Sequence, residues 1–313
     1  MADESGQGVG STKARSRTQG RQAQELQASS GTGLSASHRT PLFYAEHSAR
    51  YERQALICEY QRITSANLIV VIDQIYPTNM TILEELLSDC DRNKDLHLLL
   101  SSPGGDGETA LRMLRSMQER CQELTVIVPD MAKSAATILC LGANHLLMGP
   151  GGDLGPIDPQ MMLDGKMIAS AKEIVAAVDE AEQRVTKNPD SYTLFASLLA
   201  DVNMLMVEQA RSALDRSSSL MVEALKSQGA RSDDEVKVLT EKLQAPLIDV
   251  PSSHSAVISA DDAVHLGLPV IKADTTSEEW QILWSLWTRY FAMGCWPRGL
   301  NAIYEGQRAS HDG

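Results

Sequence analysis

Residues 96–106 read Leu-His-Leu-Leu-Leu-Ser-Ser-Pro-Gly-Gly-Asp, and this stretch decides the fold. Its first five residues are almost wholly apolar, which is typical of a short strand buried on both faces of a parallel sheet. The Ser-Pro-Gly-Gly turn ends the strand, because proline cannot donate to a ladder and glycine adopts angles that other residues avoid. Residues 108–121 then have the spacing of an amphipathic helix. Together they form one βα unit.

Further units of this kind flank the first. Short apolar runs predict strands over residues 68–72, 124–128 and 146–148. Apolar periodicity predicts helices over residues 45–64, 81–90 and 134–142, and later over residues 172–185, 191–227, 233–243 and 261–266. Strands that alternate with helices form parallel βαβ units. The sequence therefore predicts an α/β fold that becomes mostly helical after Pro159.

Composition excludes several classes of function. The formal net charge of −13 argues against general nucleic-acid binding and against electrostatic attachment of the body to an anionic bilayer. The five cysteines are scattered, odd in number and without a CxxC pair, so neither a zinc site nor a disulfide framework is expected. No signal-peptide core and no run of eighteen apolar residues is seen. A cytoplasmic protein is expected, with no metal.

The chain divides into three predicted regions. Residues 1–42 are rich in Ser, Gly, Gln and Arg and predict a disordered tail. Residues 43–275 hold the βα units, and residues 276–313 predict an amphipathic tail. In that tail Trp280, Leu283, Trp284 and Trp287 recur at helical spacing. Such a stripe faces a partner, a membrane surface or the protein's own core, and the core is the interpretation we favour.

Two loops follow the carboxyl ends of predicted parallel strands, where open sheets bind ligands. One loop is residues 101–107, which contains Gly104 and Gly105, and the other is residues 129–134, which ends at Ser134. Ser134 stands where the next helix begins, near the positive end of that helix. A serine facing bare glycine N–H groups supplies an attacking oxygen and an oxyanion hole, the two requirements of acyl transfer.

Each signal has a simpler interpretation. A Pro-Gly-Gly turn after a strand usually serves only as a turn, and a serine at a helix start is usually a cap. The two signals occur one βα unit apart, and this joint occurrence gives a functional site the same weight as the simpler interpretation.

Three motifs in order resemble one family. They are Leu-Leu-Leu-Ser-Ser-Pro-Gly-Gly-Asp at residues 98–106, Ala-Lys-Ser-Ala-Ala-Thr at 132–137, and Met-Gly-Pro-Gly-Gly-Asp-Leu-Gly-Pro-Ile-Asp-Pro-Gln at 148–160. The set resembles the Clp-type serine peptidases, above all the prokaryotic serine dehydrogenase proteinase (SDH-type) family. That family is related to signal peptide peptidase A and to membrane-bound Clp-class proteases. The resemblance covers about residues 47–272 and implies a Clp protease/crotonase-like spiral of βαβ units with a helical C-terminal extension.

The resemblance also implies roles for single residues. It makes Ser134 the nucleophile of a serine endopeptidase and gives the oxyanion-hole N–H groups to Gly104, Gly105 and Ala135. Soluble Clp peptidases place a histidine after the nucleophile helix, but this chain has Gly-Pro-Ile-Asp-Pro at residues 155–159. A histidine-based triad is therefore in doubt.

Related enzymes with a Ser–Lys dyad suggest a lysine as the base instead. Lys172 follows Ser134 by 38 residues, close to the spacing in those enzymes, and Lys166 follows it by 32. A lysine acts as a base when desolvation or nearby positive charge favours its neutral form, as a helix start does. We therefore favour Lys172, which lies at a predicted helix start, and keep Lys166 and His254 as alternatives.

Two other functions stay open. A crotonase-like acyl-CoA enzyme would share the fold and the oxyanion hole without a serine nucleophile. A catalytically inactive Clp-like scaffold would lack a working base. For the peptidase we expect a peptide or protein substrate, no cofactor, no nucleic acid and a homo-oligomer. Peripheral membrane association is suggested by the relatives.

Overall fold

The structure is a computed structural model that describes residues 40–163, 167–249 and 256–312. The predicted disordered tail, residues 1–42, lies almost wholly outside the described residues. Helix α2 (Pro41–Thr64) comes first in the described chain. The chain from Arg50 onward forms one compact unit, and the described residues of this unit hold the sheets and the candidate site.

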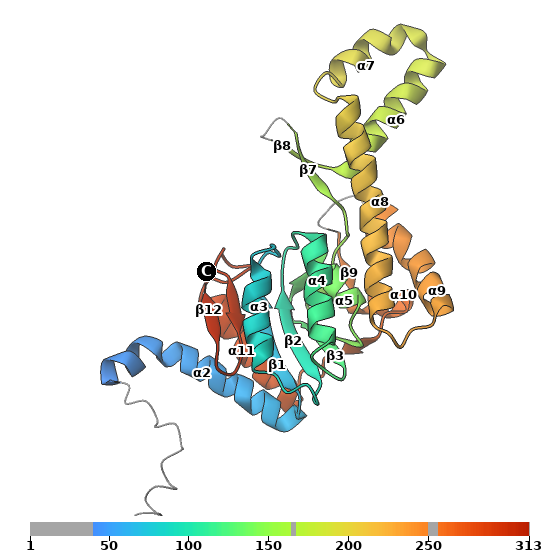
Figure 1. Cartoon of the computed structure of the whole chain (residues 1–313). Coiled ribbons are helices and arrows are strands. Elements are labelled where there is room, and N and C mark those ends of the chain that lie inside the picture. Colours follow the sequence, from blue (N-terminus) through green and yellow to red (C-terminus); the bar gives the residue numbers. More distant parts are fainter. Residues whose placement is uncertain (1–39, 164–166, 250–255, 313) are drawn as a thin grey trace, which may run out of the picture. The chain divides into compact units, whose positions relative to one another are not determined.

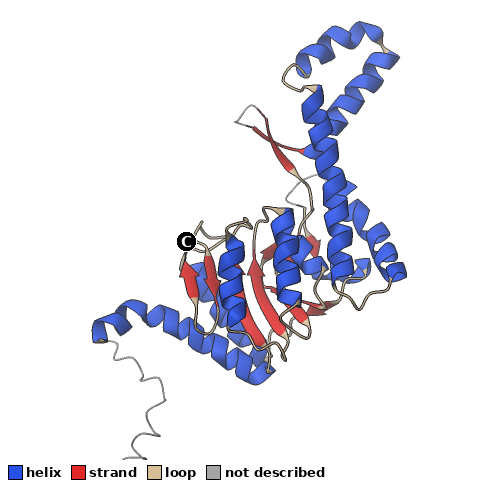
Figure 2. Cartoon of the chain, viewed as in Figure 1, coloured by secondary structure: helices blue, strands red, loops and turns tan. Residues whose placement is uncertain are grey.

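The central sheet has seven strands in the order β10-β5-β3-β2-β1-β11-β12. Five neighbouring strands are parallel, and β11 and β12 extend the sheet antiparallel at one edge. Their bounds are β1 Asn67–Ile72, β2 Leu96–Ser101, β3 Leu124–Val128, β5 His145–Met148, β10 Val270–Lys272, β11 Ile303–Glu305 and β12 Ser310–Asp312. The predicted α/β fold with a largely parallel sheet is confirmed (Figure 2).

Helices cover both faces of this sheet (Figure 1). On one face α3 (Asn79–Ser88), α4 (Gly107–Gln118) and α5 (Ala135–Leu141) enclose a cluster that includes Ile69 and Val71. On the other face residues of α2 from Arg50 onward and α11 (Glu278–Ala292) enclose a second cluster that includes Val70. Successive β1 side chains point to opposite faces, so the uniformly apolar run from Leu68 to Ile72 serves both clusters.

The segment expected to be an amphipathic tail belongs to the core. Trp280, Leu283 and Trp287 of α11 are buried. The fully buried carboxylate of Glu305 on β11 accepts bonds from Arg53 Nε at 2.7 Å and from the Tyr290 hydroxyl at 2.7 Å. A buried carboxylate is stable only when it is paired in this way. The sequence analysis did not predict strands β11 and β12, because each has three residues, too few to show a periodic pattern.

The helical region after the sheet differs from the expectation in two places. The helix predicted over residues 191–227 is two helices, α7 (Tyr192–Leu198) and α8 (Met204–Ser227). The Asn203 side chain accepts a bond from Met206 N at 2.9 Å and starts α8 afresh. An unpredicted hairpin of β7 (Gln160–Leu163) and β8 (Met167–Ser170) precedes α6 (Ala171–Lys187).

Helix α8 joins two apolar clusters. Its carboxyl half contributes Met221 and Ala224 to the main core beside α4 and α5, and its amino half packs Val207 and Ala210 on α6. Helices α9 (Asp233–Gln244) and α10 (Ala260–Leu266) complete this region of the fold. Within the described residues, no helix combines the length and the apolar character that a membrane span requires.

His97 of β2 makes part of the fold's stability depend on pH. Its Nδ1 lies 2.7 Å from the Tyr60 hydroxyl, and burial lowers the pKa of His97 to about 4 from the ordinary 6.5. Below pH 6.5 the unfolded chain gains a proton here before the folded chain does, so stability falls as the pH falls toward 4. The loss approaches about 3 kcal/mol, because one unit of pKa shift is worth about 1.4 kcal/mol.

Urea unfolding of the wild type and of His97→Gln between pH 4 and 7 measures this contribution. Between pH 4 and 7, the free energy of unfolding of the variant should depend much less on pH than that of the wild type. An equally steep curve in the variant would assign the pH dependence to other groups.

Candidate active site

The predicted nucleophile lies in a tight turn between strand and helix. Ser134 links β4 (Met131–Ala132) to α5 and has φ 50° and ψ −117°. Positive φ is uncommon outside glycine and costs about 1–3 kcal/mol, so it persists only where the surroundings hold it. The Ser134 side chain makes no capping bond to α5. Backbone strain on a half-buried serine that does not cap its helix is a reason to look for function there.

Neighbouring backbone holds this turn in place. Lys133 N donates to Ser102 O at 3.0 Å, and Ser102 N donates to Met131 O at 3.1 Å, which ties the Ser134 loop to the glycine loop. On the other side, Thr137 Oγ1 lies 2.9 Å from Ala132 O and 2.8 Å from Gly155 O. These bonds fix both ends of the turn, as a strained residue requires.

The glycine pair lies directly against Ser134. Gly104 and Gly105 have φ +106° and +140°, a region that favours glycine. Ile75 fastens the pair from the far side: its N donates to Gly104 O at 2.8 Å, and its O accepts from Asp106 N at 2.8 Å. Gly104 N is used internally, since it donates to Ser102 Oγ at 3.1 Å.

Two backbone N–H groups are left over. Among the described residues, no acceptor takes a hydrogen bond from the N–H of Gly105 or of Ala135. A Cβ placed on Gly104 would lie 3.2 Å from Ala135 N, so this N–H borders the glycine loop. Two unused donors beside a serine hydroxyl form the arrangement that can hold an oxyanion.

Replacing Gly104 with alanine should damage this arrangement. The new Cβ would lie 2.6 Å from Ser134 Cβ and 2.8 Å from Lys133 O, and φ +106° would be strained. We expect the free energy of unfolding to fall by about 1–3 kcal/mol. The rate of any hydrolysis should fall on the order of 10²-fold, because the N–H groups of Gly105 and Ala135 would no longer lie at the same distance from Ser134.

Gly151→Ala is the matched control, because a Cβ there would meet no atom within 4 Å. Urea unfolding and rate measurements on both variants test the prediction. If Gly104→Ala were as stable and as active as Gly151→Ala, the site would not depend on close contact between the glycine loop and the Ser134 loop.

A cavity of about 370 Å³ opens over Ser134. Its lining residues come from the loops after β1 and β2, the start of α5 and the segment that leads into β7 and includes its first residue: Gln74, Tyr76, Pro103, Gly105, Asp106, Ser134, Asp158, Pro159 and Gln160. The volume lies within the range of small-ligand sites. The predicted nucleophile and one free N–H donor therefore share a cavity with room for part of a substrate.

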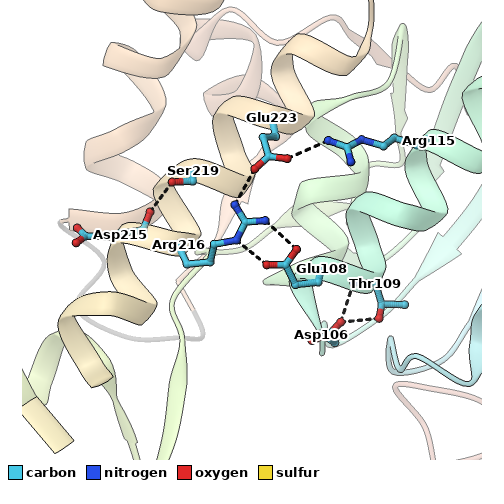
Figure 3. Close-up of polar contacts among 8 residues, drawn as sticks. All are labelled: Asp106, Glu108, Thr109, Arg115, Asp215, Arg216, Ser219 and Glu223. Atoms are coloured by element: carbon cyan, nitrogen blue, oxygen red, sulfur yellow. Dashed lines mark hydrogen bonds and ion pairs between the residues drawn. The ribbon is translucent and has the colours of Figure 1, made fainter. Parts of the chain in front are cut away.

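Asp106 anchors the amino end of α4 at this cavity. It caps the helix by accepting from Thr109 N at 2.7 Å. Two residues further, Glu108 accepts from Arg216 of α8, which also donates to Glu223, as Figure 3 shows. Arg216 holds the pKa of both glutamates below the ordinary range, and Arg115 adds to this effect at Glu223, although these groups are largely solvated. The network joins α4 to α8 close to the site.

The residues beside Ser134 in sequence point elsewhere. Lys133 forms an ion pair with Asp153, so its side chain is committed to the loop that precedes Gly155. Burial, and then the nearby Asp153, raise the pKa of Asp130, while Lys133 lowers it. Lys133 is therefore an unsuitable base.

Of the three candidate bases, Lys172 alone lies within the described residues. Lys172 is the second residue of α6, and its N donates to the Ser170 cap at 3.1 Å. Ser170 Oγ donates to Asp158 at 2.7 Å, and Ala171 N donates to Pro159 O at 2.9 Å, so the start of α6 is fastened to the cavity wall. Lys166 and His254 lie outside the described residues.

The structure therefore brings Ser134, Gly104, Gly105 and Ala135 together and puts Lys172 on a helix tied to the same cavity. Among the described residues, none accepts a hydrogen bond from the Ser134 hydroxyl.

Sequence reasoning missed several supporting residues. Ile75 acts through its backbone, which leaves no mark in a sequence. Thr137 was visible within its motif, but its two carbonyl partners come from other loops. Asp158 lies in the Gly-Pro-Ile-Asp-Pro stretch, and its bond to Ser170 could not be foreseen without the β7–β8 hairpin.

Comparison with known proteins places the chain in a family. The sequence model described as "ClpP-like SDH-type serine proteinase" matches residues 81–287, more than half of the chain. Two uncharacterised proteins of Methanocaldococcus jannaschii are similar in sequence. One is 30% identical over 57% of this chain and 54% of its own length, and the other is 24% identical over 47% and 44%. The chain thus spans about half the length of these curated relatives.

A solved structure was also found, that of a mutant of the 1510-N membrane-bound stomatin-specific protease. It has a TM-score of 0.40 and 14% identity, over 66% of this chain and 77% of that one. This likeness is too low to match residues. The family match and the α/β fold together show that the chain belongs to the ClpP-like SDH-type serine proteinases.

Proposed function

We propose that this protein is a serine peptidase that cleaves peptide bonds through Ser134. The observation that carries the proposal is the strained backbone of Ser134, at φ 50°, beside two N–H groups without acceptors in the described structure. Family membership supports the same class of activity. Strain of this kind is retained where it serves a site, because folding alone does not require it.

The proposed reaction is a two-step acyl transfer. Ser134 Oγ attacks the carbonyl carbon of the scissile peptide while a base takes the hydroxyl proton. The N–H groups of Gly105 and Ala135 bind the resulting oxyanion, and Gly104 holds the loop against the serine. Collapse expels the amine with the proton returned by the base, and water then releases the acyl group by the reverse sequence. No metal or cofactor is needed.

For the base we propose Lys172. Its helix begins at the wall of the Ser134 cavity, through the bond from Ser170 to Asp158 and that from Ala171 to Pro159. Lys166 and His254 remain the alternatives, and variants at all three positions separate them.

Hydrolysis of unstructured peptides tests the function. The full chain should release new amino termini from a mixture of peptides, as detected by mass spectrometry, and a fluorophosphonate should stop the release. A chain that cleaves no peptide but hydrolyses or hydrates an acyl-CoA thioester would instead be the crotonase-like enzyme. A chain that does neither would be the inactive scaffold.

We also propose that the protein assembles as a homo-oligomer. Large apolar side chains stand exposed on α7 and at the start of α8; they are Tyr192, Leu194, Leu198, Met204 and Leu205, each at least 59% accessible. Exposed apolar surface of this extent commonly marks an interface.

Light scattering over a range of concentrations and salt should give a mass that is a multiple of 34.1 kDa. Leu198→Glu together with Leu205→Glu should shift that mass toward one chain, because like charges would be buried in the contact. A monomeric wild type at every concentration would contradict the assembly.

A further inference from the structure

A second cavity lies at the carboxyl ends of β3 and β5, beside α11. Its volume is about 430 Å³, and it shares no lining residue with the cavity at Ser134. The residues that line it are Pro129, Asp130, Pro150, Gly151, Thr275, Trp280, Gln281, Trp284 and Trp287. Apolar rings with a few polar groups are the usual lining of a site for a small organic group.

Tryptophan forms one wall of this cavity. Trp280, Trp284 and Trp287 are three of the four tryptophans in the chain, and their spacing puts them on one side of α11. Trp280 and Trp287 are 5% exposed, whereas Trp284 is 49% exposed. The Trp280 ring is fixed against Gly149, where a Cβ would lie 2.6 Å from Cη2. Indole faces attract cations more strongly than any other side-chain ring does.

The opposite wall carries a carboxylate that lacks a partner. Oδ2 of Asp130 is buried, and no described group donates a hydrogen bond to it. Lys133 is close enough to affect Asp130, but its ammonium is paired with Asp153 and lies 3.4 Å from both Leu154 O and Ala256 O. The ion pair and these two carbonyl contacts commit the Lys133 ammonium to groups other than Asp130. A buried acceptor without a donor is costly, and a cationic donor would offset that cost.

From these features we propose that the cavity binds an alkylammonium group, with its apolar stem against the tryptophans and an N–H donated to Asp130. Charge selects this class of ligand: Asp130, Asp153 and Lys133 together carry a net charge of −1, which repels an anion. A neutral apolar ligand would leave Oδ2 of Asp130 without a donor, and a quaternary ammonium has no N–H to give. The group could come from a lysine side chain of another protein or from a free amine.

Calorimetric titration of the full chain with n-hexylamine and with 1-hexanol tests the charge requirement, because the two probes share one stem. We expect the amine to bind at least tenfold more tightly. Asp130→Asn should lower amine affinity at least tenfold and leave the alcohol unchanged, whereas Trp284→Ala should weaken both. Glu278→Gln is the matched control, since Glu278 is an exposed acid of α11 that does not line the cavity.

Equal affinity of the wild type for the two probes, or no binding of the amine, would overturn the proposal, and neither result depends on a variant that folds. Wild-type affinity of Asp130→Asn for the amine would also overturn it. Nα-acetyl-lysine N-methylamide identifies the source of the group. If it binds, and its Nε-acetylated form does not, the ligand is a protein side chain; if only hexylamine binds, the ligand is a free amine. Both results uphold the alkylammonium class.

Discussion

Replacing Ser134 with alanine should abolish peptide hydrolysis while the chain stays folded. The substitution removes the only atom proposed to attack the substrate, so a rate loss on the order of 10⁴–10⁶-fold is expected. Stability should change little, because the Ser134 side chain makes no capping bond to α5. Alanine at φ 50° carries the same backbone strain as serine, so the loop keeps its shape.

Ser191→Ala is the matched control. Ser191 also precedes a helix, α7, without capping it, but it lies outside the cavity. Rates on a cleaved peptide and urea unfolding of both variants give the comparison. Hydrolysis by Ser134→Ala at the wild-type rate would show that Ser134 is not the nucleophile.

Replacing Lys172 with alanine should give the second large effect. Loss of a general base lowers the rate on the order of 10²–10⁴-fold. His254→Ala and Lys166→Ala should each cost little, and the wild-type rate should keep rising above the pH range in which histidine titrates. Lys187→Ala is the control, since Lys187 is exposed at the opposite end of the same helix.

The outcomes assign the base directly. A large loss in His254→Ala with a normal rate in Lys172→Ala would make His254 the base and the mechanism histidine-dependent. A large loss only in Lys166→Ala would move the role to that lysine. Normal rates in all three variants would leave the proposed dyad without a base.

The parallel part of the sheet could be predicted because its signal is local. The runs at residues 68–72 and 124–128 are apolar at every or nearly every position, and both are buried strands. Strand β11 could not be predicted in the same way: it has three residues, and its place depends on pairing with β1 far away in sequence. Helix α8 begins at Asn203 because its side chain caps there, a signal hidden inside a long helical pattern.

The candidate site shows the same difference between residues with a local signal and contacts between distant segments. Ser134 and the two glycines stand in short motifs, so their chemistry could be recognised before their positions were known. Their geometry depends on contacts between distant segments, such as Ile75 with Gly104, that no local pattern contains. The proposed base depends on a contact of this second kind, since the start of α6, which carries Lys172, is tied to the cavity wall by the bond from Ser170, the last residue of the β7–β8 hairpin, to Asp158.

Covalent labelling with a fluorophosphonate, followed by mass spectrometry of the digested protein, tests the central claim most directly. An activated serine beside an oxyanion hole attacks phosphorus as it would attack a carbonyl carbon, and the adduct stays on the nucleophile. We predict one adduct, on the peptide that contains Ser134, and none in Ser134→Ala. An adduct on a different serine, or a wild-type chain that stays unlabelled, would contradict the proposal that Ser134 is the nucleophile.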